Sequence, residues 1–189
     1  MNLFFNNAKN SLLCVGGVAI AWLFFFKLNI FIFSFLEQSQ FVNLVFMPAG
    51  VRLVSVLLFN ELGVVGLFVG ALITSPIVGT NLKEALVISL ISSLNPYLAV
   101  LVTKRLLHVD NLLKKLHAKE LMIMGGFSAL FNCISHHFYF GLSDLHMSWE
   151  SFINMFMGDL LGITLMLFLF SLSLKFMRQS TLKRRLTRT

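Results

Sequence analysis

Long runs of apolar residues, separated by short polar stretches, fill most of this sequence. The runs neither alternate apolar with polar positions, as a half-buried strand would, nor keep their apolar residues on one helical face. Most approach the roughly 20 residues that a transmembrane helix needs and exceed the roughly 10 residues of a membrane-spanning strand. We therefore expect an all-α, polytopic transmembrane bundle of about six helices that forms a single domain. The expected helices span residues 11–35, 41–60, 62–78, 83–103, 121–141 and 151–177, followed by a basic cytoplasmic tail at 178–189.

The composition agrees with a surface that faces lipid. Hydrophobic residues make up 57% of the chain and charged residues 12%, about half the charged share of a typical soluble domain. In lipid, every backbone N–H and C=O group must be paired within the protein, which leaves helices or closed barrels. The first apolar run is longer than the core of a signal peptide and lacks a clear cleavage site, so we expect it to be retained. We expect a multi-pass protein of the bacterial cytoplasmic (inner) membrane.

Positive charges concentrate in the loop after the fourth expected helix and in the C-terminal tail. Cytoplasmic loops of membrane proteins carry an excess of Lys and Arg, so both regions are expected in the cytoplasm. The N-terminus falls on the same side, which gives an N-in, C-in topology. The net charge of +7 then reflects topology and contact with anionic lipid, so the bilayer is an expected partner and nucleic acid is not. The loop residues are Lys104, Arg105, Lys114, Lys115 and Lys119, and the tail residues are Lys175, Arg178, Lys183, Arg184, Arg185 and Arg188.

Two charged residues lie well inside expected helices. Counted from the outer ends of the second and sixth helices at 1.5 Å per residue, Arg52 and Asp159 lie at similar depths. A charge inside a membrane is costly and marks a functional hypothesis, and a guanidinium and a carboxylate at one depth can pair directly or through water. The pair either fixes helix packing alone or lines a ligand or ion site.

Two proline-containing stretches lie inside the second and fourth expected helices. Pro48 and Gly50 precede Arg52, and Pro96 follows Asn95. Proline removes a backbone donor and kinks a helix, and glycine adds freedom. Irregular backbone at membrane depth is tolerated only where it is buried in protein or lines a water-filled cavity. We expect helix breaks at Pro48, Gly50 and Pro96, which either line a polar cavity in the outer half of the bundle or act as packing kinks.

The fifth expected helix carries a stripe of polar residues. Small and hydroxyl residues normally mark helix contacts in membranes, but Asn132 and His136 are larger, and we expect them to line the same site as Arg52, Asp159 and Asn95. His136 and the next histidine point about 100° apart, which does not suit one metal ion or haem, so no metal and no cofactor are expected. Protonation of His136 is a further alternative.

Other motifs predict packing rather than catalysis. Gly66-x-x-x-Gly70 and Gly158-x-x-x-Gly162 allow helix backbones to approach closely. The sequence contains no GxSxG, HExxH or glycine-rich phosphate loop, and Cys133 near two histidines lacks an orienting third group. We therefore expect no enzymatic activity.

Two stretches resemble the MASE1 membrane sensor domain. The first is Phe46-Met47-Pro48-Ala49-Gly50-Val51-Arg52-Leu53, followed by a glycine-rich helix, and the second is Met157-Gly158-Asp159-Leu160-Leu161-Gly162-Ile163. MASE1 domains are usually fused to cytoplasmic output modules such as histidine kinases or diguanylate cyclases. No such module precedes Thr189, so the resemblance implies a stand-alone sensory or ligand-binding bundle. Its ligand is unknown, and a membrane or cytoplasmic protein is a candidate partner.

A coarser similarity supports a second hypothesis. The length, the six helices and an outward cavity also fit the substrate-binding membrane subunits of energy-coupling-factor transporters of small solutes, on size and topology alone. A transporter subunit is expected to co-purify with an ATPase module or a second membrane protein, whereas a sensor acts on a kinase or a cyclase.

Overall fold

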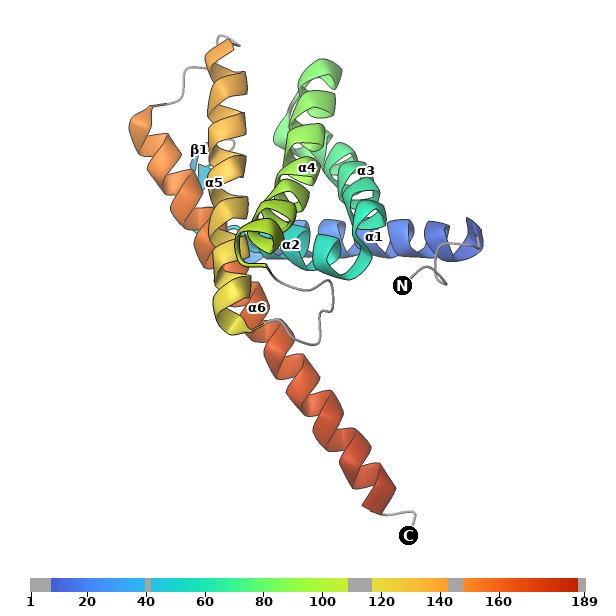
Figure 1. Ribbon diagram of the computed structural model, residues 1–189. Coiled ribbons are helices and arrows are strands. Elements are labelled where there is room, and N and C mark those ends of the chain that lie inside the picture. Colours follow the sequence, from blue (N-terminus) through green and yellow to red (C-terminus); the bar gives the residue numbers. More distant parts are fainter. Residues whose placement is uncertain (1–7, 40–41, 109–116, 143–147, 187–189) are drawn as a thin grey trace.

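The computed structural model describes residues 8–39, 42–108, 117–142 and 148–186 as a helical bundle with one short hairpin. The elements are α1 (Ala8–Phe33), the 3-10 helix η1 (Ser34–Leu36), β1 (Glu37–Ser39), β2 (Val42–Asn43), α2 (Met47–Phe59), α3 (Glu61–Val78), α4 (Leu82–Leu106), α5 (Ala118–Leu142) and α6 (Trp149–Leu186). Figure 1 shows that α3, α4 and α5 have roughly aligned axes, with α4 running opposite to α3 and α5, that α1 and α2 cross them, and that the second half of α6 projects from the bundle. The predicted all-α membrane bundle is confirmed.

The second helix begins later than the sequence predicted. A helix from about residue 41 was expected, but β1 and β2 pair as an antiparallel hairpin and α2 begins at Met47. Pro48 lies in the first turn of α2, where the missing N–H would have had no intrahelical partner. Pro48 therefore starts a helix, and the predicted break there is wrong. The N–H of Met47, the first residue of α2, donates to Oδ1 of Asn29 in α1 at 2.8 Å.

The other two predicted breaks do not interrupt their helices either. Pro96 is buried inside α4, which continues from Leu82 to Leu106. Gly50 is buried inside α2, where a Cβ atom would collide with the side chain of Met166 in α6. Both residues serve packing, and Gly50 is needed for close approach rather than for a bend.

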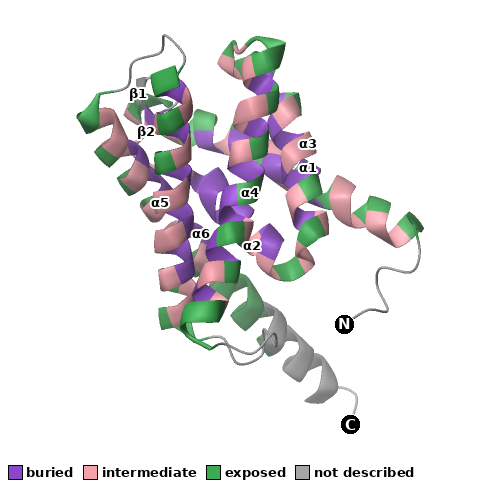
Figure 2. Ribbon diagram, turned by 45° about the horizontal axis from the view of Figure 1, so that its top comes forward, coloured by how far each residue is buried: buried purple, intermediate pink, exposed green. Residues whose placement is uncertain are grey.

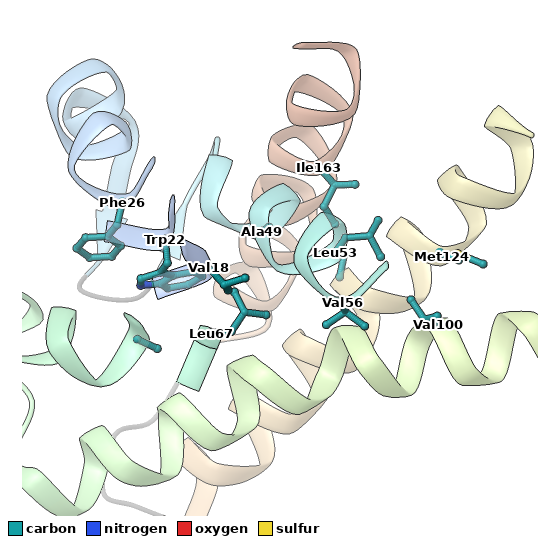
Figure 3. Packing of buried hydrophobic residues seen from close by; sticks show 12 residues of the cluster. Val18, Trp22, Phe26, Ala49, Leu53, Val56, Leu67, Val100, Met124 and Ile163 are labelled. Carbon is teal, nitrogen blue, oxygen red and sulfur yellow. The ribbon is translucent and has the colours of Figure 1, made fainter. Parts of the chain in front are cut away.

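α2 is the central helix of the bundle. Nine of its 13 residues are buried, and all six helices contribute side chains to the apolar cluster around it (Figure 3). Leu53 and Val56 of α2 are 0% exposed. A helix this short can lie inside the membrane region because its neighbours enclose it, so its polar side chains face protein rather than lipid.

The first small-residue motif joins α3 to α1. A Cβ atom on Gly66 would collide with Val18, and one on Gly70 would collide with Trp22. The two glycines lie one helical turn apart on the face of α3 that covers α1. The predicted role in close packing is confirmed for this motif.

Among the residues that the structure describes, four helical segments are long and apolar enough to cross a membrane, by length and composition: Ala8–Leu36, Glu61–Val78, Leu82–Leu106 and Trp149–Phe176. α2 has 13 residues, or about 20 Å at 1.5 Å per residue, which is less than the roughly 30 Å hydrocarbon core. Figure 2 shows buried residues facing the inside of the bundle and exposed ones outside. The exposed outer faces carry many Leu, Ile and Phe side chains, as expected of a multi-pass membrane protein in contact with lipid.

Two parts of the predicted basic regions lie outside the described residues. They are 109–116, which include two of the loop lysines, and 187–189 at the end of the tail. The backbone of the expected tail from residue 178 continues α6 as far as Leu186.

Candidate functional site

A buried ion pair lies between three helices of the bundle. Arg52 Nη2 donates to Asp159 Oδ1 at 2.9 Å, and each side chain is 3% exposed. Asn132 connects the two: its Oδ1 accepts from Arg52 Nη1 at 2.8 Å, and its Nδ2 donates to Asp159 Oδ2 at 2.7 Å. The contact predicted from matched depth is present, and Asn132 closes it into a ring. Arg52 of α2, Asn132 of α5 and Asp159 of α6 are termed the Arg–Asn–Asp triad.

The triad satisfies its charges within itself. The hydrogen bonds are charge-assisted and short, and in a low-dielectric interior either charge alone would be strongly unfavourable. The ring of Phe46 adds a cation–π contact, with the guanidinium carbon of Arg52 5.5 Å from the ring centroid. Arg52 Nε is buried without a hydrogen-bond partner among the described residues.

Asp159 reaches Arg52 because two glycines let the chain before α2 lie directly on α6. A Cβ atom on Gly158 would collide with the carbonyl oxygen of Asn43, and one on Gly162 would collide with that of Phe46. The N–H of Phe46 donates to the carbonyl oxygen of Gly158 at 3.0 Å. The predicted close contact at this motif is therefore made mainly with the non-helical chain that precedes α2.

A cavity of about 360 Å³ adjoins the triad. All three triad residues line it, and Glu37 and Ile77, which also line it, are exposed. The cavity therefore reaches the surface at the end of the bundle where α3 ends and α4 begins. Further polar lining residues are Asn29, Asn43, Thr74, Ser75, Thr80, Ser89, Ser92 and His136, and aromatic ones are Trp22, Phe26 and Phe46.

His136 lies in the cavity wall, as predicted. Its Nδ1–H donates to the carbonyl oxygen of Asn132 at 2.8 Å, and its Nε2 lies 3.5 Å from Ser92 Oγ. With the proton on Nδ1, Nε2 of the neutral ring is an acceptor. His137 turns elsewhere, with Nε2 3.3 Å from the carbonyl oxygen of Ser148. No group of three or more His, Cys, Asp or Glu residues suited to a metal ion occurs in the described part of the chain.

Asn95 is placed apart from the cavity, although the sequence assigned it to the site. It is buried in α4, and its Oδ1 accepts from Ser135 Oγ of α5 at 3.2 Å. The cavity wall on α4 is formed instead by Ile88, Ser89 and Ser92, which lie closer to the start of that helix. Asn95 therefore links α4 to α5 beyond the cavity.

Sequence reasoning missed the contribution of α1 and α3. Asn29, which is 1% exposed, both lines the cavity and binds the start of α2. Trp22 Nε1 donates to Thr74 Oγ1 at 3.1 Å, which joins α1 to α3 in the cavity wall. The sequence did contain a signal for Asn29, which is an amide side chain inside a long apolar run. A buried polar group in a membrane helix needs a partner.

Comparisons with known proteins place the chain in a family. No curated protein and no solved structure matches it. The model of the MASE1 family matches residues 11–189, which include every triad residue and both glycine motifs. The chain therefore belongs to MASE1, a family of membrane-associated sensor domains.

Proposed function

We propose that this sensor domain binds a small molecule in the cavity beside the Arg–Asn–Asp triad and passes the change along α6. The proposal rests on the position of Asp159. Its carboxylate belongs to the triad in the cavity wall, and its backbone belongs to α6, which continues without interruption to Leu186. A ligand that alters the triad therefore acts directly on a helix that leaves the bundle (Figure 1).

The dimensions of α6 suit it to carry a displacement. It has 38 residues, or about 57 Å at 1.5 Å per residue, nearly twice the roughly 30 Å hydrocarbon core. Ile163 and Met166 in its first half are buried in the bundle, whereas all but one of residues 168–176 are exposed. Helix shifts of about 1–2 Å are an established form of switching, and a rigid helix would carry such a shift to its far end.

The far end of α6 is proposed to meet its partner in the cytoplasm of a bacterial cell. The asymmetric distribution of Lys and Arg supports an N-in, C-in orientation in the cytoplasmic membrane. We propose that the partner is a signalling protein or domain. The chain would act by binding rather than by catalysis, because its sequence carries no GxSxG, HExxH or glycine-rich phosphate loop. Neither the described contacts nor the comparisons favour a transporter subunit.

A distance measurement in lipid nanodiscs tests the coupling. Nitroxide labels are placed on Leu106, at the end of α4, and on Phe176, on α6, both of which are exposed. The native thiols are removed by Cys14→Ser and Cys133→Ala. The distance distribution between the labels then reports the position of α6 relative to the bundle.

The perturbation is Asp159→Asn, which keeps the size of the side chain. The three contacts of the triad would then share only two acceptor oxygens, one on Asn132 and one on the new amide. One donor–donor contact therefore remains in every arrangement, so the triad must rearrange and the distance should shift by about 1–2 Å or more. Gly126→Ala is the matched control, because its Cβ atom meets nothing within 4 Å. An unchanged distribution in Asp159→Asn would contradict the proposed coupling.

A further inference from the structure

We propose that the ligand of this cavity is an uncharged, amphipathic small molecule that carries a hydroxyl, carbonyl or amide group, and is neither an organic anion nor an organic cation. The inference rests on the proposed sensory function and names the class of molecule for the same site. It follows from three properties of the described cavity wall: its charge balance, its unused hydrogen-bonding groups and its aromatic side.

The charges in the wall already compensate one another. Both Nη groups of Arg52 and both oxygens of Asp159 have partners inside the triad. A ligand carboxylate, even one that accepts from the unpaired Nε of Arg52, would add a second carboxylate beside a guanidinium that Asp159 already neutralises, and a buried charge without a counterion is strongly unfavourable. A ligand ammonium bound by Asp159 would strand Arg52 in the same way. Besides His136, the remaining ionisable side chain in the described wall is Glu37, which is exposed at the opening.

Uncharged polar groups in the wall retain unused hydrogen-bonding capacity. Ser89 is 1% exposed, and its Oγ has no hydrogen-bond partner within the described chain. Asn43 Oδ1 is also buried and unpaired there, and Ser92 Oγ makes only the 3.5 Å contact with His136. Buried polar groups are nearly always paired, because an unpaired one loses its hydration without compensation. A neutral ligand group that accepts from Ser89 or donates to Asn43 supplies the partner without adding a charge.

The aromatic part of the wall suits the apolar portion of such a ligand. Trp22 stacks on Phe26 with ring centroids 6.3 Å apart and meets Phe46 edge-on at 6.4 Å. The cavity volume of about 360 Å³ equals about a dozen water molecules at roughly 30 Å³ each and lies near the lower end of ligand-site volumes. The space fits one ring or one short chain with a single polar group.

Three cyclohexane derivatives of one size test the proposed class. Cyclohexylmethanol, cyclohexanecarboxylate and cyclohexylmethylammonium share the ring and differ in charge. The full chain, in phosphatidylcholine nanodiscs, carries Trp149→Phe, which leaves Trp22 in the cavity wall as the sole tryptophan, since the sequence contains two. We expect a saturable change in Trp22 fluorescence with the alcohol, at a Kd at least tenfold lower than with either ion.

Variants of serine distinguish binding in the cavity from partition into lipid. Ser89→Leu removes the hydroxyl group and fills space, so the saturable response to cyclohexylmethanol should disappear. Ser171→Leu, at an exposed serine of α6, is the matched control and should keep the response. Ser89→Ala removes only the hydroxyl group, should weaken binding several-fold, and serves where Ser89→Leu does not fold.

Each contrary result overturns the proposal in a distinct way. Binding of the carboxylate or the ammonium probe as tight as that of the alcohol would refute the charge argument. The absence of a saturable response to all three probes would refute the proposed class. An unchanged response in Ser89→Leu and Ser89→Ala would refute the location. None of these results bears on the coupling through α6, because that coupling is measured separately by the label distances in Asp159→Asn.

Discussion

Removing one charge of the Arg–Asn–Asp triad is expected to destabilise the protein more than removing both. Asp159→Leu deletes the acceptor of hydrogen bonds of 2.9 Å from Arg52 and 2.7 Å from Asn132, and it leaves a guanidinium in a side chain that is 3% exposed. Arg52→Met leaves the carboxylate at the same depth with Asn132 alone. Loss of one partner of a buried pair typically costs about 3–5 kcal/mol, because the other charge is left uncompensated.

The double variant removes both charges and leaves Asn132 as the group without partners. An unsatisfied buried amide costs about 1–3 kcal/mol, and apolar side chains of similar volume often replace a buried ion pair without further loss. The double variant should therefore be less destabilised than either single variant. The resulting coupling energy is at least about 3 kcal/mol, the upper end of the range for residues in contact.

Unfolding by SDS in mixed micelles, followed by circular dichroism and tryptophan fluorescence, gives the free energies for this cycle. Asn95→Leu is the matched control, because Asn95 is also a buried amide but contacts Ser135 rather than the triad. Its cost should add to that of Asp159→Leu within about 0.5 kcal/mol. If the costs of Arg52→Met and Asp159→Leu also simply add, the pair does not interact and the reasoning is refuted.

Three further predictions follow from the packing and the charge pattern. Gly158→Ala should destabilise the fold by about 1–3 kcal/mol in the same unfolding assay, because the new Cβ atom meets backbone; Gly126→Ala should not, and equal effects would contradict the explanation. Asn29→Leu should cost roughly 0.5–2 kcal/mol through loss of the acceptor at the start of α2, and an unchanged free energy of unfolding would exclude that role. Reporter fusions at Thr189 should report the cytoplasm and those near Ser143 should not; a periplasmic signal at Thr189 would rule out the N-in, C-in topology.

The fold class and the central ion pair could be predicted from the sequence because both follow from the lengths of apolar runs and the positions of charges within them. A long apolar run must satisfy its backbone, which specifies a helix. The depth of a charge in such a run can be counted in residues, and Arg52 and Asp159 match in depth on that count. The polar stripe of the fifth expected helix added Asn132 and His136 to the expected site, and both lie in the same cavity wall.

The start of α2 could not be predicted in the same way. Residues 41–46 are mostly apolar, and hydropathy does not distinguish an extended apolar segment from a helix. Pro48 is compatible with a helix interior that kinks and with a first turn that does not. The decisive interactions are long-range: Gly158 accepts the N–H of Phe46, and Asn29 accepts that of Met47.

Depth along a helix does not by itself determine which side chains line the cavity, as Asn95 shows. Ser89, Ser92 and Asn95 are all buried in α4, but only the two serines line the cavity. Ser92 and Asn95 are separated by about 4.5 Å along the helix axis, which is comparable to the uncertainty of the predicted helix boundaries. Which part of α4 lines the cavity depends on the side chains of the neighbouring helices, and the position of a residue along α4 does not reveal them.

The two glycines that flank Asp159 connect the cavity to the position of α6. They bring the backbone before α2 onto α6, and that contact sets where Arg52 meets the carboxylate. A shift of α6 must therefore change the glycine contacts and the triad together, because Gly158 and Asp159 are adjacent on one rigid helix. Gly158→Ala should consequently disturb both stability and cavity shape, whereas Ser89→Ala should alter ligand binding alone, so the two variants separate the proposed coupling through α6 from the proposed binding of a ligand.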